Sequence, residues 1–158
     1  MTTSQSLPDE HIYAIGLLVT NMTRTESSLI DLATVTTGAD ILHVLILLGT
    51  QSFSNKIDCV KASYSIGNTD DELRSDPVIA LLNQIKKVGD FRNTVVHSMW
   101  ADDAGVLHAV KFDARGKLRR HKHPAPTADI LAQALEAERL GTELRGIVQA
   151  LRAQGQPT

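Results

Sequence analysis

Cysteine, aromatic residues and net charge are all scarce in this chain of 158 residues. The single cysteine, Cys59, excludes an intramolecular disulfide and any zinc site built from several cysteines. Aromatic residues make up only 4% of the sequence while alanine and leucine are plentiful, which is typical of helices packed through aliphatic side chains. The net charge of -2 excludes binding to nucleic acid through overall charge, so any such contact has to be local.

Long hydrophobic runs are also missing. The longest, residues 41–48, is too short to cross a bilayer and contains His43, which we expect to lie in or at the edge of the core with Leu42 and Val44. The first eight residues are polar and uncharged, unlike a secretion signal. We therefore expect a soluble, cytoplasmic protein with no membrane contact, forming one domain over residues 1–158.

The familiar catalytic motifs are absent from the sequence. It has no glycine-rich phosphate loop, nucleophile elbow, zinc-peptidase helix or paired-carboxylate motif. Function has to be inferred from residues that interrupt the pattern of the fold.

Apolar residues recur at helical spacing over most of the chain. Capping residues and prolines mark the helix starts, which fall at Pro8-Asp9, Asp40, Ser52, Asp76-Pro77 and Thr127. The predicted helices cover about residues 9–36, 41–48, 53–65, 77–99 and 127–153. Gly141 and Gly146 either weaken the last helix or allow another helix to approach it closely.

The stretch from about residue 100 to 123 differs from the rest of the chain. Val106, His108 and Val110 alternate with their neighbours as in a strand, between turn-like segments at 102–105 and 113–116. Residues 117–123 are expected to pair back on this strand. The predicted fold class is therefore all-α: a four- to five-helix bundle with a small β-hairpin inserted before the last helix, and a flexible tail at 154–158.

Two charged residues interrupt apolar helix stripes. Arg92 falls in the stripe of the helix over 77–99, and Glu26 falls in that of the first helix. A buried guanidinium needs an anionic partner, which is either a side chain such as Glu26 or a bound phosphate. Asn93 and His97 are one turn apart on an edge of the Arg92 stripe.

The run Arg92-Asn93-Thr94-Val95-Val96-His97 resembles the signature of the HEPN superfamily, which is an arginine followed after four to six residues by a histidine. The polar residue after the arginine, the helical bundle and the hairpin before the last helix also resemble prokaryotic HEPN-like proteins. Glu26 and Lys56 resemble supporting residues more loosely. The resemblance implies a homodimer that joins two motifs in one cleft, acts on RNA without a cofactor or metal, and works in toxin–antitoxin, stress or phage-defence biology, with an antitoxin protein as a further partner.

The chemistry implied by this resemblance uses the 2′-hydroxyl of RNA as the nucleophile. His97 would transfer protons, Arg92 would stabilise charge on the phosphate, and Asn93 would orient the imidazole or hold a phosphate oxygen. Two other readings stay open: a non-catalytic HEPN-like module that binds RNA, nucleotides or a protein, and a structural helical dimer in which Arg92 pairs with Glu26.

Basic residues crowd the predicted hairpin, where only Asp113 opposes them. A phosphate backbone would suit this surface, and so would a solvated edge protected by charge. His121 and His123 share one face of a strand, with His108 as a neighbour, but they form only a weak metal pair. The candidate RNA-binding residues are Arg115, Lys117, Arg119, Arg120 and Lys122, together with Lys111.

Overall fold

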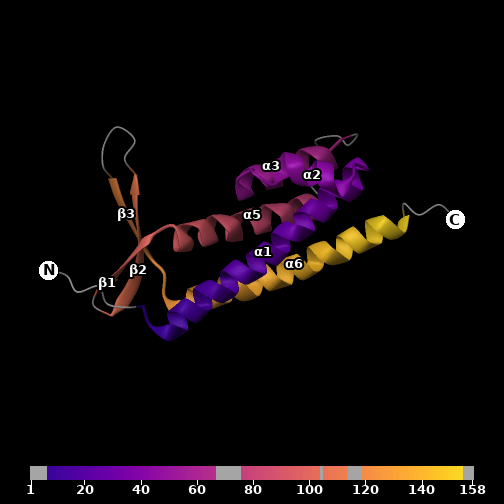
Figure 1. Cartoon of the computed structure of the whole chain (residues 1–158). Helices are drawn as coiled ribbons and strands as arrows, with labels where there is room; N and C mark the ends of the chain where they lie inside the picture. The colour runs from indigo at the N-terminus through magenta and orange to yellow at the C-terminus, as the bar shows by residue number, and fades with distance from the viewer. Residues whose placement is uncertain (1–6, 67–75, 104, 114–118, 155–158) are drawn as a thin grey trace.

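The computed structural model describes residues 7–66, 76–103, 105–113 and 119–154, and these are mostly helical. Figure 1 shows α1 and α6 lying side by side, α3 and α5 beside them, and a small sheet at one end of the molecule. In chain order the elements are α1 (Asp9–Thr37), α2 (Ile41–Leu48), α3 (Phe53–Tyr64), α5 (Pro77–Val96), β1 (Met99–Asp103), β2 (Val106–Asp113), β3 (Arg119–Pro124) and α6 (Thr127–Gln154).

The predicted helix caps at Asp40, Ser52 and Asp76 are confirmed, whereas Thr127, also predicted as a cap, is the first residue of α6. Oδ1 of Asp40 accepts a hydrogen bond from the backbone N–H of Leu42 at 2.8 Å. Oγ of Ser52 accepts one from the N–H of Asn55 at 3.3 Å, and Oδ1 of Asp76 accepts one from the N–H of Val78 at 2.7 Å. Each side chain satisfies an N–H group that the first helical turn leaves unpaired, which fixes where the helix starts.

The last helical turn predicted for residues 77–99 does not form. α5 ends at Val96, His97 is its C-cap, and the chain enters β1 at Met99. The helical spacing of Val95 and Met99 suggested a continuing stripe, but Trp100 pairs with Ala109 in the sheet and packs against the core. Tertiary packing therefore outweighs the local periodicity here.

The predicted hairpin belongs to a three-stranded antiparallel sheet in the order β1-β2-β3. Strands β2 and β3 pair as expected, with Lys111 opposite His121. Asp102 and Asp103 were predicted in a turn but lie in β1, where Asp103 is opposite Val106. The turn falls later, at Gly105, whose φ of 83° suits glycine.

The core is densest along the seam between α1 and α6, which is partly polar. Nδ2 of Asn21 donates a hydrogen bond to the carbonyl oxygen of Ala134 at 3.0 Å, and Oγ1 of Thr25 donates to that of Ala137 at 3.2 Å. Both polar side chains are buried. These bonds cross between the two helices and fix how one is placed against the other. The aliphatic side chains with no exposure here include Leu18, Leu29, Leu32, Leu140 and Leu144.

Gly141 lets α1 and α6 approach closely, whereas Gly146 faces open space. A Cβ at Gly141 would lie 2.5 Å from Oγ1 of Thr25, but a Cβ at Gly146 would meet nothing within 4 Å. Gly141→Ala is therefore expected to lower the free energy of unfolding by ~1–2 kcal/mol through overpacking. Gly146→Ala should raise it by ~0.5–1 kcal/mol through helix propensity. Urea denaturation of both variants measures the two changes in the free energy of unfolding. Stabilisation by Gly141→Ala would contradict the close packing of α1 against α6 at Gly141.

Buried His11 joins the start of α1 to the sheet and to α6. Its side chain has no exposure, Nδ1 lies 3.0 Å from Oγ1 of Thr127, and its ring meets that of Trp100 edge-on with centroids 4.4 Å apart. Nε2 is buried without a partner among the residues that the structure describes. Burial lowers the pKa of His11 below its usual value, because the charged imidazolium would lose its water.

Acid is expected to destabilise the protein through His11. The folded state disfavours the proton that the unfolded chain binds below about pH 6.5, so stability is complete above that pH and falls as the pH drops towards the lowered pKa of His11. Urea denaturation between pH 7.5 and 5 should show a decline that is smaller in His11→Gln. The matched control is His43→Gln, because His43 is exposed. An identical decline in His11→Gln and wild type would refute the assignment.

α2 lies on the surface, contrary to the prediction for Leu42 and His43. Only Val44 and Leu48 are buried, at 5% and 8% exposure, whereas Leu42 is 64% exposed and the His43 side chain 77%. A short run that is apolar on every side gives no periodic signal of which edge faces the core. No helix in the described part of the chain has the length and hydropathy needed to span a membrane.

Candidate functional site

The C-terminal end of α5 carries Arg92, Asn93 and His97. Val88 and Val95, at 4% and 1% exposure, hold this part of the helix against the core. Arg92 lies between them in the stripe and is half-buried, as its position in the sequence predicted. Its Nη1 donates a hydrogen bond to Oδ1 of Asn93 at 3.0 Å. The helix thus presents a guanidinium and an amide joined to each other.

The charge of Arg92 is not neutralised within the described part of the chain. Its Nε is buried without a hydrogen-bond partner there, and no ion pair to Arg92 is formed. A guanidinium has five N–H donors, and the one hydrogen bond found for Arg92 leads to a neutral amide. Arg92 therefore keeps its positive charge and, at its Nη atoms, N–H donors beyond the one bonded to Asn93.

The predicted pairing of Arg92 with Glu26 is wrong, because Glu26 pairs with Lys56. Nζ of Lys56 donates to Oε1 of Glu26 and to the carbonyl oxygen of Gly49, the latter at 3.4 Å. Lys56 is buried, and its side chain is 9% exposed against 32% for that of Glu26. Glu26 interrupts its stripe on the part of α1 that packs against α3. Neither Glu26 nor Lys56 forms a hydrogen bond or ion pair with Arg92, Asn93 or His97. The two residues instead form an ion pair between α1 and α3.

His97 lies at the end of α5 with its side chain in solvent. Its backbone N–H donates to the carbonyl oxygen of Asn93 at 3.2 Å, which places the two residues one turn apart as predicted. Its imidazole makes no hydrogen bond to the side chain of Arg92 or Asn93. An exposed imidazole is free to exchange a proton with a bound molecule. Arg92 and His97 are therefore close in sequence, but their side chains are not hydrogen-bonded to each other.

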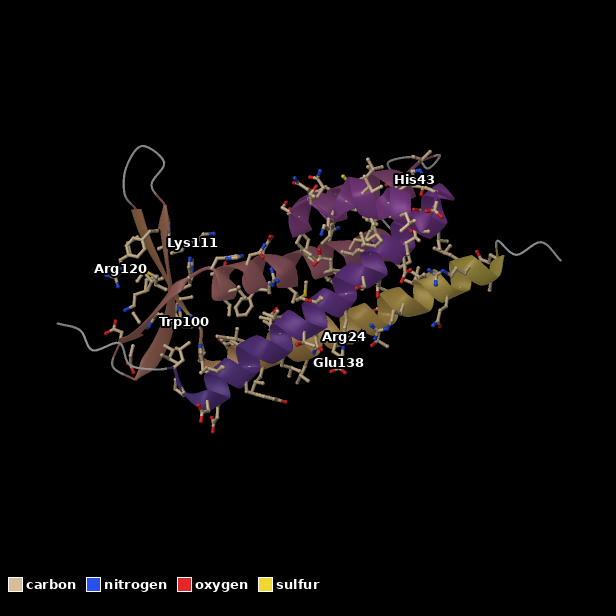
Figure 2. The ribbon with its side chains drawn as sticks, in the orientation of Figure 1. Arg24, His43, Trp100, Lys111, Arg120 and Glu138 are labelled. Atoms are coloured by element: carbon tan, nitrogen blue, oxygen red, sulfur yellow. The ribbon has the colours of Figure 1, made fainter. Side chains whose placement is uncertain are left out.

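Basic side chains lie on both faces of the sheet. Arg120 and Lys122 are two residues apart on β3 and therefore lie on the same face of the sheet. On this face Arg120 is the register partner of Phe112, which is 48% exposed. Lys111 is on the opposite face, which it shares with Trp100, and Figure 2 shows Arg120 and Lys111 on opposite sides of the sheet. The basic residues therefore form two smaller surfaces instead of one.

The sequence predicted Asp113 as the only acidic residue near the basic side chains of the hairpin. The structure adds a second one, Asp103. Lys122 donates to Oδ2 of Asp103, and this contact lowers the pKa of the Asp103 carboxyl. Arg119 pairs in register with Asp113 through the backbone. Arg115 and Lys117 lie outside the described residues. On the face that carries Arg120 and Lys122, Lys122 is paired with Asp103. Arg120 is exposed and forms no ion pair with any of the described residues.

In the described part of the chain, the structure brings no third metal ligand to His121 and His123, the possible metal pair predicted from the sequence. His121 and His123 share one face of β3, but the register places His108 on the other face of the sheet, with Lys122. The described residues contain no group of three side chains suited to hold a metal ion. Two surface hollows lie along α6, one of them bounded by Arg24 and Glu138, which Figure 2 shows close together. Neither hollow is lined by Arg92 or His97.

The burial of His11, whose Nε2 has no partner among the described residues, was not among the predictions from the sequence. His11 falls on the buried stripe of α1, three residues before Ala14 and seven before Leu18. That spacing was the available signal, since a histidine in phase with core residues is expected to be buried.

Comparison of the chain with protein-family models, curated proteins and solved structures finds no match. Function therefore has to be inferred from this chain alone. Its most informative feature is the unneutralised Arg92 bonded to Asn93, one turn before an exposed histidine.

Proposed function

We propose that the protein is a metal-independent endoribonuclease of HEPN type. The observation that carries the proposal is the half-buried guanidinium of Arg92, which has an unpaired Nε and no carboxylate partner in the described residues. Keeping such a charge in a core-facing stripe is costly unless an anion completes it. RNA phosphate is an anion that a planar guanidinium binds through two parallel hydrogen bonds.

The reaction needs only groups that RNA and the motif supply. The 2′-hydroxyl loses its proton to a base and attacks the adjacent phosphorus, and the bond to the 5′-oxygen breaks as that oxygen gains a proton. The products are a 2′,3′-cyclic phosphate and a 5′-hydroxyl. His97 takes or returns a proton, Arg92 stabilises charge on the non-bridging oxygens, and Asn93 orients the guanidinium to which it is bonded.

A homodimer is part of the proposal. One imidazole cannot serve as base and acid at the same instant, and two copies of the motif would supply two. The protein is proposed to act on RNA in the cytoplasm, in toxin–antitoxin, stress or phage-defence biology. In a toxin–antitoxin system, an antitoxin protein would be a further partner.

The sheet face with Arg120 and Phe112 is proposed to bind the RNA strand outside the cleavage site. An exposed aromatic ring beside a free guanidinium suits a base and the neighbouring phosphate. Lys122 contributes less, because Asp103 already holds its charge.

The second candidate is a HEPN-like module that binds RNA or nucleotides without cleaving them. The observation that favours it is the lack of any hydrogen bond between the His97 ring and the Arg92–Asn93 pair. This module would bind RNA through Arg92 and leave it intact.

Cleavage of RNA in EDTA tests the proposal and separates it from the second candidate. Wild-type protein should cut a mixed single-stranded RNA without added metal, and it should leave the same sequence intact when every 2′-hydroxyl is replaced by hydrogen. Binding of both oligonucleotides without cleavage of either would favour the second candidate. Cleavage of the 2′-deoxy strand would contradict attack by the 2′-hydroxyl.

A further inference from the structure

α2 exposes apolar side chains that the packing of one chain does not need. All of its eight residues except His43 are aliphatic, yet only Val44 and Leu48 are buried. The other five form the α2 face, with exposures of 44% for Ile41 and Leu45 and 64%, 75% and 69% for Leu42, Ile46 and Leu47. A helix that is apolar all round is usually covered on all sides.

The α2 face is large enough to form the apolar centre of an interface, but not a whole interface. The five side chains expose roughly 500 Å² of apolar surface, at the upper end for the largest patch on a monomer. A stable interface buries about 800 Å² on each partner, with an apolar centre inside a polar rim. Exposed polar residues at the two ends of α2 would supply that rim: Asp40, Thr50 and Gln51. His43 lies within the face, between Ile46 and Leu47.

The charges around α2 narrow the choice of occupant. No lysine or arginine occurs between residues 25 and 55, so α2 and the segments that flank it in the sequence lack the cations that draw a helix to an anionic membrane. It also lacks a charged stripe for a strongly acidic or basic partner. A surface that is apolar and nearly uncharged is best matched by another of its own kind, as in a two-fold symmetric dimer.

We infer that the α2 face binds the α2 face of a second copy of this chain. The contact is isologous, with α2 packed on α2 and the exposed sides of Leu42 and Ile46, one turn apart, at its centre. The inference does not depend on the proposed ribonuclease activity. Figure 1 shows α2 at the end of the molecule away from the sheet, whereas α5 ends next to the sheet. This interface is therefore separate from the cleft in which two motifs would meet.

Light scattering coupled to gel filtration tests the inference with one charged substitution. Ile46→Glu should halve the mass of the wild-type assembly at about 50 μM protein. Leu135→Glu is the matched control, because Leu135 is a 60% exposed leucine on α6, and it should leave the mass unchanged. Circular dichroism confirms that both variants stay helical.

Charge complementation then tests the symmetry of the contact. Ile46→Lys should also halve the mass, and mixing it with Ile46→Glu should restore the wild-type mass, since unlike charges then meet. A monomeric wild type overturns the inference, and so does a folded Ile46→Glu variant with unchanged mass. Binding of wild-type monomers to phospholipid vesicles would assign the face to a membrane instead.

Discussion

Replacing Glu26 with alanine is expected to lower the free energy of unfolding by about 3 kcal/mol, because it leaves a buried ammonium without its carboxylate. Lys56 is 7% exposed, and its remaining contact, to the carbonyl oxygen of Gly49, is long at 3.4 Å. The loss should appear in urea denaturation as a lower midpoint with an unchanged slope.

Two further variants show whether the cost of Glu26→Ala comes from leaving a buried charge unpaired or only from losing an ion pair. Asp58→Ala breaks the pair between Asp58 and Lys86, whose side chains are 54% and 30% exposed, and should cost less than about 1 kcal/mol. Combining Glu26→Leu with Lys56→Met should recover most of the stability lost in Glu26→Ala, because no buried charge is left. Equal costs for Glu26→Ala and Asp58→Ala would refute the account of Lys56.

Removing the imidazole of His97 is expected to slow RNA cleavage by about 10²–10⁴-fold, the range for loss of a general acid or base. The His97 side chain is exposed, so His97→Ala should change the free energy of unfolding by less than about 0.5 kcal/mol. His43→Ala removes another exposed histidine, on α2, and should cleave at the wild-type rate. Single-turnover assays with excess enzyme report these rates.

Arg92→Lys distinguishes charge from geometry at the same site. Lysine keeps the charge but loses the planar donors that hold Asn93 and bind a phosphate in two places. Cleavage should fall by about 10²-fold or more, close to the loss in Arg92→Ala. A wild-type rate in Arg92→Lys would show that a point charge suffices and that the bond to Asn93 has no catalytic role.

Helix positions were the part of the fold that the sequence predicted best. Caps act locally, so Asp40, Ser52 and Asp76 mark starts that the structure confirms. β1 was missed because its five residues, with two consecutive aspartates, carry no alternating pattern. Its Trp100 pairs with Ala109 and packs against the core, a long-range contact that the local sequence does not indicate.

The partners of charged residues were harder to predict. The sequence correctly indicated that Arg92 and Glu26 interrupt buried stripes, but it could not show which helix each one faces. The choice of Lys56 over Arg92 for Glu26 follows from the packing of α1 against α3, a long-range property. The helix end was also predicted wrongly: His97 was expected inside the helix over 77–99, but it is the C-cap of α5 and is exposed.

Mapping of the product ends in EDTA tests the ribonuclease claim most directly. Wild-type protein and His97→Ala are incubated with the same RNA, and the termini are identified by mass spectrometry. We predict 2′,3′-cyclic phosphate and 5′-hydroxyl ends with the wild type, and intact RNA with His97→Ala. RNA left intact by the wild type, or the same ends produced equally well by His97→Ala, would contradict the assignment of this site.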